Sequence, residues 1–493
     1  MLENIYKVML IRLSKNSFVR IYDHGSLGYI NNQLTKHDRT YLGSGADFLL
    51  QITRQPQNEE DIVKKIDKIY DAPREVIAKD FEEFVADLEA HKFVVRGSST
   101  EELDSKDLYF TYNIDNPKTL VEDFTQDTIE TVHKDTQDYL LQHDLKRPRL
   151  ASLQFELTSR CNERCIHCYI PNGKKNMGFD LSFDKFKYIL DQYVDMGGLH
   201  VTLSGGEALM NKYIKEMLRY CREKDLQISL LTNLISLTDE MIPVLKDVNL
   251  SLIQVSLYSM NEEIHDKITT VKGSWAKTKS AIEKLYAADI PVQISCPVMK
   301  ANKEGYERVM EYAQSLKMKS TTDYIMMAQA DLDTKNLANR ISIVETERVI
   351  RDIIEYDLDY KKNTLNQDSY IEMSMEEQMN MPLCGAGIND LCVTVNGDVY
   401  PCAGWQAFVV GNVFKTSLKD IWENSEQLKM IRRVTWKDFP KCLECDVRDF
   451  CSMCLVRNYN ENDGDMFKTT DHFCQVARLN KRLVEEYQEK GFL

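Results

Sequence analysis

Cysteine is the residue whose placement in this 493-residue sequence points most directly to chemistry. Three of the thirteen cysteines stand together in Cys161-Asn-Glu-Arg-Cys165-Ile-His-Cys168, and eight fall between Cys384 and Cys474. A long chain with clustered cysteines and no secretory pattern favours metal binding over disulfide bonds. These clusters are therefore the first candidates for a functional site.

The first cluster has the spacing C-x3-C-x2-C and follows a strand expected at residues 153–157. Three thiolates in one tight loop can ligate three irons of a cubane cluster, which leaves the fourth iron open to a small molecule. A structural zinc site is the alternative, because the loop also offers the imidazole of His167 as a fourth ligand.

The segment Ser204-Gly205-Gly206-Glu207 follows the next expected strand. Together with the cysteine spacing, it resembles the radical S-adenosylmethionine (SAM) superfamily. The resemblance implies that SAM chelates the open iron and that the Gly-Gly-Glu segment contacts the SAM amino group. Two glycines let a backbone approach closely, and Glu207 can accept from an ammonium. The residues expected to bind SAM are His167, Ser204, Gly205, Gly206, Glu207, Asn233 and Ser256. For Asn233 and Ser256, at strand ends, ordinary capping is the alternative.

The second group reads Cys384-x12-Gly397-x4-Cys402, then C-x2-C-x5-C-x2-C from Cys442 to Cys454, and then a single Cys474. Gly397 is typical of a hairpin turn, which would fold Cys384 and Cys402 towards each other. Seven cysteines exceed one tetrahedral zinc site and approach the eight thiolates that two four-iron clusters use. A zinc knuckle is the alternative for the C-x2-C pairs.

This order resembles the SPASM extension of radical SAM peptide maturases, although the last spacing is x2 where x3 is usual. The resemblance implies three [4Fe–4S] clusters, one catalytic and two auxiliary. By this analogy the nearer auxiliary cluster is held by Cys384, Cys402 and Cys454, and the outer one by Cys442, Cys445, Cys451 and Cys474. With three thiolates, the nearer cluster would keep one iron open unless Cys392 closes it. We expect Cys392, Cys221 and Cys296 to be packing residues.

Between residues 150 and 330, short strand-like runs alternate with helical stretches such as 183–196 and 276–288. The expected strands cover residues 153–157, 200–203, 228–232, 252–257, 292–296 and 324–327. Six β–α repeats predict an α/β fold with a parallel sheet and crossover helices. Six repeats fall short of eight, so we expect a partial (β/α)6 barrel with its site at the C-terminal strand ends.

Residues 1–97 are expected to form a small α+β domain, with strands at 8–13 and 17–22 before three helical segments. This order resembles the winged-helix, PqqD-like domain that binds precursor peptides. A DNA-binding winged helix is the alternative, and the acidic helices disfavour it. The expected order continues with a linker at 98–149, the barrel at 150–330, a bridging helical region at 331–383 and the SPASM domain at 384–493.

Composition narrows the functional class. A formal net charge of −15 disfavours bulk nucleic-acid binding. The sequence contains no run of about 18 apolar residues, so it predicts no membrane-spanning helix. Residues 1–15 lack the apolar run and cleavage site of a signal peptide, and we expect a cytoplasmic protein.

These features predict a radical SAM maturase that modifies a ribosomally synthesised, cysteine-containing precursor peptide. The resemblance implies hydrogen abstraction by a 5′-deoxyadenosyl radical, a thioether product, and a low-potential electron donor such as flavodoxin or ferredoxin. No catalytic side chain is assigned from the sequence. The alternatives are a carbon–carbon crosslinking maturase and an anaerobic sulfatase-maturing enzyme, in which an Asp would stand at Ala403. A zinc-dependent winged-helix transcription factor is the alternative of a different class.

Overall fold

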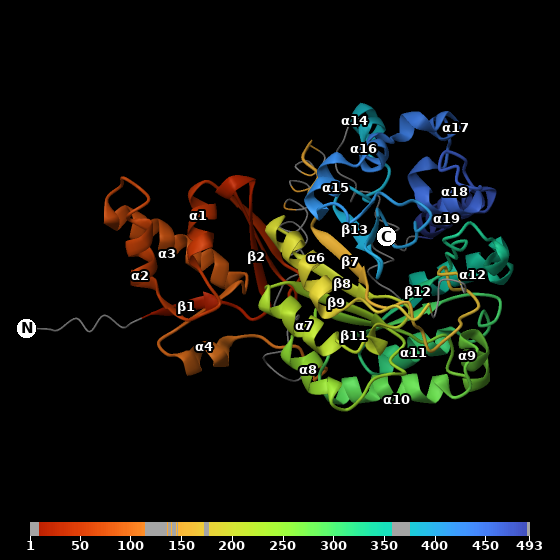
Figure 1. The fold of residues 1–493 in the computed structure, drawn as a ribbon, viewed down its shortest axis with the longest axis horizontal. Helices are drawn as coiled ribbons and strands as arrows, with labels where there is room; N and C mark the ends of the chain where they lie inside the picture. The colour runs from red at the N-terminus through yellow and green to blue at the C-terminus, as the bar shows by residue number, and fades with distance from the viewer. Residues whose placement is uncertain are drawn as a thin grey trace, which may run out of the picture. The chain divides into compact units, whose positions relative to one another are not determined.

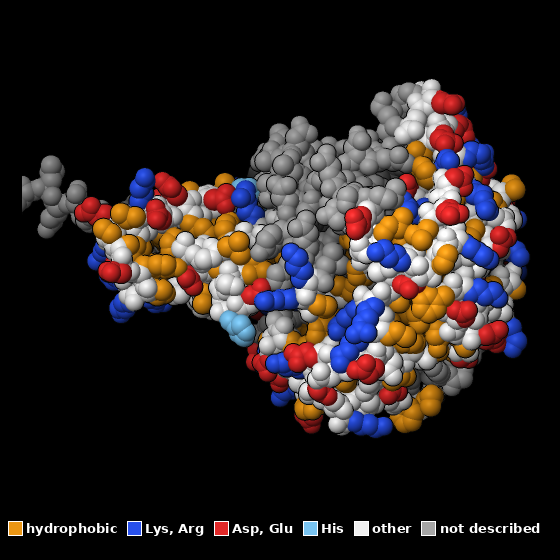
Figure 2. Space-filling model, turned by 90° about the horizontal axis from the view of Figure 1, so that it is seen from above, with side chains coloured by type: hydrophobic (Ala, Val, Ile, Leu, Met, Phe, Trp, Pro, Cys, Tyr) orange, Lys and Arg blue, Asp and Glu red, His pale blue; other side chains and the backbone are white. Residues whose placement is uncertain are grey.

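The computed structural model describes residues 9–113, 146–171, 177–356 and 375–490, with residues 136, 140 and 144. These residues form two compact units, of which the first comprises mainly the N-terminal residues up to 142. No helix in the described ranges is both long enough and apolar enough to cross a membrane. On the face drawn in Figure 2, Lys and Arg side chains are interspersed with Asp and Glu.

The first unit contains two small antiparallel sheets with strand orders β5-β1-β6 and β2-β3-β4. The strands are β1 (Leu10–Leu13), β2 (Ser17–Tyr22), β3 (Leu27–Asn32), β4 (Asp38–Leu42), β5 (Gln57–Asn58) and β6 (Val94–Gly97). The two strands expected from the sequence are present, but they belong to different sheets.

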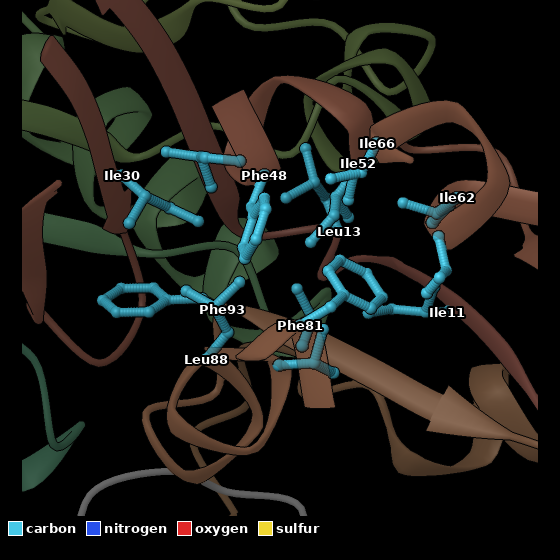
Figure 3. Packing of buried hydrophobic residues seen from close by; sticks show 14 of the residues in the cluster. Ile11, Leu13, Ile30, Phe48, Ile52, Ile62, Ile66, Phe81, Leu88 and Phe93 are labelled. Atoms are coloured by element: carbon cyan, nitrogen blue, oxygen red, sulfur yellow. The ribbon is translucent and has the colours of Figure 1, made fainter. Parts of the chain in front are cut away.

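The three expected helices of the first unit are α1 (Ser44–Gln51), α2 (Glu59–Ile66) and α3 (Arg74–Ala90). Their apolar faces meet around Phe48, Phe81 and Phe93, which are almost completely buried (Figure 3). The Asn58 side chain accepts a hydrogen bond from the Glu60 amide and so caps the start of α2.

The expected linker at 98–149 begins as part of the first unit, contrary to the sequence prediction. Helix α4 (Thr100–Lys106) is followed by Asp107, whose carboxylate accepts from Arg12 at 2.7 Å and from the Ser14 hydroxyl at 2.8 Å. Arg12 and Asp107 are both buried. A polar segment looks like a linker in sequence, but here its acid pairs with a buried arginine. Most of the remaining linker lies outside the described residues.

The second unit is built on parallel strands in the order β12-β11-β10-β9-β8-β7. They are β7 (Ser152–Glu156), β8 (His200–Ser204), β9 (Gln227–Thr232), β10 (Leu252–Ser256), β11 (Val292–Pro297) and β12 (Lys319–Asp323). The connecting helices lie on the outside of this sheet (Figure 1). They are α6 (Phe183–Asp195), α7 (Ile214–Glu223), α8 (Met241–Asp247), α9 (Glu262–Thr269), α10 (Ser274–Ala287) and α11 (Glu307–Ser315). The partial barrel expected from the sequence is confirmed.

The sixth strand is displaced from its predicted position. The sequence favoured the apolar run 324–327, whereas β12 is the polar segment Lys319–Asp323. Within the sheet as described, β12 is at the end of the strand order and pairs with β11. The apolar residues Ile325 and Met327 follow the strand and line a cavity instead.

The cysteine-rich tail continues the same sheet, because β13 (Asp390–Val393) pairs in parallel with β7. Strands β14 (Asp398–Tyr400) and β15 (Gly411–Asn412) follow in antiparallel fashion. The hairpin predicted at Gly397 is present, with φ at +82°.

Further helices are α12 (Ile343–Tyr356), α14 (Met375–Asn380), α15 (Leu418–Asn424), α16 (Glu426–Arg433), α17 (Pro440–Leu443), α18 (Leu455–Glu461) and α19 (Asp471–Glu489). Short 3-10 helices are η1 (Asp23–Gly25), η2 (Ala208–Met210), η3 (Lys335–Asn339), η5 (Trp436–Asp438) and η6 (Arg448–Phe450).

Candidate functional site

The first cysteine cluster lies in the loop after β7, at the C-terminal edge of the sheet. None of Cys161, Cys165 and Cys168 is in a disulfide, and all three are partly buried. The loop is fixed to the end of α9, because the amides of Arg164 and Ile166 donate to carbonyls of that helix at 3.0 Å. The thiols are therefore carried by a loop whose backbone is already anchored.

Cys165 has two polar neighbours that the sequence reading missed. Its thiol donates to the Glu163 carboxylate at 3.2 Å, and the Tyr258 hydroxyl lies 3.8 Å from its sulfur. Tyr258 follows β10, and burial raises its pKa well above the usual tyrosine value. Its hydroxyl therefore keeps a proton that it can donate towards a thiolate. The sequence signal was an aromatic residue two positions beyond Ser256.

Gly205 and Gly206 pack directly against the cysteine loop. The Gly206 amide donates to the Thr158 carbonyl at 2.8 Å, and the Glu207 amide donates to the Arg160 carbonyl at 2.8 Å. A Cβ on Gly206 would lie 2.3 Å from the Arg160 carbonyl oxygen. The close approach expected of these glycines is thus made to the cysteine loop itself, and the two motifs form one structural unit.

The Glu207 carboxylate connects the Gly-Gly-Glu segment to the end of β9. It accepts hydrogen bonds from the Thr232 hydroxyl at 2.6 Å, the Asn233 amide at 2.7 Å and the Leu209 amide at 3.0 Å. Glu207 is only 2% exposed, and burial raises its pKa. Three protein donors thus fix the direction of this carboxylate, and its expected contact with the SAM amino group stays a prediction.

The other residues expected to bind SAM gather around the same strand ends. The Asn233 side-chain amide donates to Asn162, beside Cys161, at 2.6 Å. The hydroxyls of Ser256 and Tyr258 are hydrogen-bonded. The His167 ring packs edge-on against Tyr258, with the centroids 4.9 Å apart. The Ser204 carbonyl accepts from the Leu157 amide at 2.9 Å, which ties β8 to the loop after β7.

The tail cysteines separate into two electrostatically coupled sets. Burial raises the pKa of Cys402 to about 12, and the charges of Asp390, Cys384 and Cys454 add smaller increases. Burial and the charge of Cys474, with smaller effects of Cys442 and Cys445, raise the pKa of Cys451 to about 11. The assignment of these cysteines to two separate clusters, made by analogy from the sequence, stays a prediction. Thiols that raise one another's pKa share a neighbourhood that a cationic cluster would make favourable for thiolates.

Among the described residues, no three or more His, Cys, Asp or Glu side chains are arranged to hold a metal ion. The donors fit an iron–sulfur cluster in type, because thiolates are the ligands that such clusters use. The remaining cysteines, Cys221, Cys296 and Cys392, are at most 1% exposed. Cys392 nevertheless lies near enough to Cys402 for that charge to raise its pKa further.

A cavity of about 420 Å³ opens beside the first cysteine loop. His167 and Tyr169, which flank Cys168, line one side of it. Asp323 at the end of β12 lines a second part, and Cys454 and Arg457 from the tail line a third. One cavity thus borders the first cysteine loop and a member of the second group.

Family comparisons agree with this geometry. Residues 155–327 match the radical SAM superfamily, and residues 384–446 match the SPASM iron–sulfur cluster-binding domain. Residues 41–94 match the coenzyme PQQ synthesis protein D (PqqD) family. The chain is a radical SAM enzyme.

Among curated relatives of this radical SAM enzyme is the AdoMet-dependent heme synthase of Methanosarcina barkeri, 28% identical over 63% of this chain and 92% of that protein. Another is the antilisterial bacteriocin subtilosin biosynthesis protein AlbA of Bacillus subtilis, 26% identical over 62% of this chain and 68% of that protein. The crystal structure of Streptococcus suis SuiB bound to precursor peptide SuiA shares the fold, with a TM-score of 0.60 and 16% identity. The match covers 94% of this chain and 99% of the SuiB chain.

Proposed function

We propose that this enzyme modifies a cysteine-containing precursor peptide by joining the cysteine sulfur to a carbon atom as a thioether. The observation that carries the proposal is the cavity shared by Tyr169, beside the first cysteine loop, and by Cys454 of the tail. A substrate in this cavity would lie beside two iron–sulfur centres at once. The PqqD match and the likeness to SuiB, whose structure contains a precursor peptide, support a peptide as the substrate.

Three sets of thiolates would hold three [4Fe–4S] clusters. The first is Cys161, Cys165 and Cys168, the second is Cys384, Cys402 and Cys454, and the third is Cys442, Cys445, Cys451 and Cys474. When bound, SAM and a reduced cluster supply a 5′-deoxyadenosyl radical that takes a hydrogen atom from an unactivated carbon.

The protein's own contribution is to bind, orient and exclude water. His167, Ser204, Asn233 and Ser256 border the space proposed for SAM, at the C-terminal strand ends. Gly205 and Gly206 hold the SAM-facing backbone against the cysteine loop. Glu207 acts through its hydrogen bonds to Thr232 and Asn233, which fix the ends of two strands. Such fixed geometry is what restrains a reactive intermediate to one path.

The N-terminal unit would bind the leader part of the precursor. One of its two sheets has the order β2-β3-β4, and an extended peptide can add to a sheet edge through main-chain hydrogen bonds. We propose a cytoplasmic enzyme that takes electrons from a low-potential donor such as flavodoxin or ferredoxin. Thirteen cysteines without a disulfide suit a reducing compartment.

Carbon–carbon crosslinking is the second candidate, because it uses the same hydrogen abstraction. A sulfatase-maturing activity is less well supported, since Ala403 stands where those enzymes carry an Asp. The product distinguishes thioether formation from carbon–carbon crosslinking. A thioether blocks alkylation of the peptide cysteine, whereas a carbon–carbon bond leaves the thiol free.

The test begins with anaerobically purified protein. The reduced wild type is expected to convert SAM to 5′-deoxyadenosine and to yield a peptide lighter by two hydrogen atoms. The variant Cys161→Ala/Cys165→Ala/Cys168→Ala should lose both activities while keeping the iron of the tail. Retention of 5′-deoxyadenosine formation in this variant would overturn the assignment of the first cysteine loop.

A further inference from the structure

Asp323 and Arg457 face the same cavity from different parts of the second unit. Asp323 ends β12, and Arg457 lies in α18 of the cysteine-rich tail. Among the described residues that line the cavity, they supply the carboxylate and the guanidinium, and most of the others are apolar. Neither residue was singled out in the sequence, because neither belongs to a motif.

Arg457 is fixed by its contacts, and one nitrogen of its guanidinium has no hydrogen-bond acceptor among the described residues. It is 4% exposed, its guanidinium stacks over Phe473 at 3.9 Å, and its Nη2 donates to the Ser452 carbonyl. Its Nη1 is buried and has no hydrogen-bond partner among the described residues. A buried, unpaired donor of this kind is costly unless a bound ligand accepts from it. The acceptor that suits it is a carbonyl or carboxylate oxygen.

Asp323 is positioned to receive a proton. Its carboxylate accepts from the Ile325 amide at 2.7 Å, which fixes its direction. Burial raises its pKa, while the Ile325 amide and the charge of Arg457 lower it. A carboxylate with a raised pKa is a better base than an exposed aspartate.

Other titratable residues around the cavity are less suited to accept a proton. Tyr169 directly follows Cys168 of the first cysteine loop, and its phenol is a hydrogen-bond donor rather than a base. The His167 ring packs against Tyr258 beside Cys168. Cys454 belongs to the coupled set around Cys402.

We propose that Asp323 accepts the proton that leaves the peptide as its new bond forms, and that Arg457 binds a carbonyl or carboxylate oxygen of the same peptide. This inference rests on the proposed function. Joining sulfur to carbon removes two hydrogens from the peptide. The C–H hydrogen leaves as an atom and goes to the SAM-derived radical. The S–H bond breaks, its proton goes to Asp323, the C–S bond forms, and the one surplus electron passes to an oxidised iron–sulfur cluster.

The experiment uses the full-length, cluster-loaded enzyme and its cysteine-containing precursor peptide, deuterated at the reacting carbon. If the wild type does not modify this peptide, the proposed function fails, whatever Asp323 does. With an active wild type, Asp323→Asn is expected to slow crosslinking about 100-fold. The same variant should still form deuterated 5′-deoxyadenosine close to the wild-type rate, because hydrogen abstraction precedes the proton transfer. Asp323→Glu should restore part of the crosslinking, and Asp333→Asn, outside the cavity, should behave as wild type.

Arg457→Gln should raise the KM for the peptide about tenfold or more, with the iron content unchanged. The matched control is Arg482→Gln on α19, an exposed arginine paired with Glu347. Crosslinking at the wild-type rate by Asp323→Asn would overturn the role of Asp323. Loss of deuterated 5′-deoxyadenosine in that variant would also overturn it, since Asp323 would then serve an earlier step. An unchanged KM, or a loss of iron, in Arg457→Gln would overturn the role of Arg457.

Discussion

Because Gly206 has no Cβ, the Gly-Gly-Glu segment can pack directly against the first cysteine loop. A Cβ at this position would lie 2.3 Å from the Arg160 carbonyl oxygen and 3.0 Å from the Cys161 Cβ, so alanine cannot fit without moving the cysteine loop. Because a shift of about 1 Å can cost a reaction about 100-fold, we expect Gly206→Ala to lower SAM cleavage at least that much. Gly305→Ala is the control, since a Cβ there meets nothing within 4 Å despite its φ of +93°. Iron content and 5′-deoxyadenosine formation measure the effect, and equal losses in both variants would contradict the steric argument.

His265 makes the stability of the barrel depend on pH. It is completely buried, its Nδ1 accepts from the Tyr258 amide at 3.2 Å, and burial lowers its pKa to about 4. The unfolded chain binds this proton near pH 6.5, so stability is present above that pH and is lost as pH falls towards 4. Between pH 7 and pH 5 we expect a loss of about 2 kcal/mol from this group.

Unfolding by denaturant under anaerobic conditions measures this effect. The variant His265→Asn keeps an acceptor for the Tyr258 amide but cannot bind a proton. Wild type should therefore lose about 2 kcal/mol more than the variant between the two pH values. An identical pH dependence would show that His265 is not the group responsible.

The hairpin between β13 and β14 positions the nearer auxiliary set. Gly397 has a left-handed backbone, and a Cβ there would lie 2.4 Å from the Phe414 ring. The left-handed conformation alone costs alanine about 1–2 kcal/mol, and the clash adds to this. We expect Gly397→Ala to lose iron from the tail while the first cluster still cleaves SAM. Gly464→Ala shares the left-handed strain at φ +90°, but its nearest contact is 3.5 Å. The two variants therefore separate clash from strain by iron analysis, and equal iron content would refute the positional role.

Strands and helices differ in how far the sequence determines them. The barrel strands β7 to β11 were predictable because buried apolar residues recur at every second position along them, and helical stretches separate the strands. Strand β12 was misplaced because its residues are polar and the apolar run after it lines a cavity. Helix α4 looked like a linker because the ion pair of Arg12 with Asp107 joins residues 95 positions apart. The cysteines and Gly206 could be singled out from the spacing of their motifs. Asp323 and Arg457 belong to no motif, and only the fold brings them to the same cavity.

At the scale of the whole molecule, one sheet extends from the barrel into the cysteine-rich tail. Strand β7 pairs with β8 on one side and with β13 on the other. The first cysteine loop and the Gly397 hairpin therefore both follow from strands of one hydrogen-bonded sheet. Continuity of this kind explains how residues from both parts can line one cavity without a separate docking interface.

The N-terminal unit should be separable from the catalytic chemistry. Because the N-terminal stretch of this unit includes α4 and Asp107 and runs to residue 142, the deletion that removes this stretch is 1–142 rather than 1–97. We expect this deletion to raise the KM for the full precursor at least about tenfold, equivalent to about 1.4 kcal/mol of binding. SAM cleavage without peptide should be largely preserved, because every residue proposed for the first cluster and for SAM lies beyond residue 150. The leader-free core peptide is the matched substrate control, and its KM should not change on deletion. An equal KM for the full precursor before and after deletion would mean that the leader binds elsewhere in the chain.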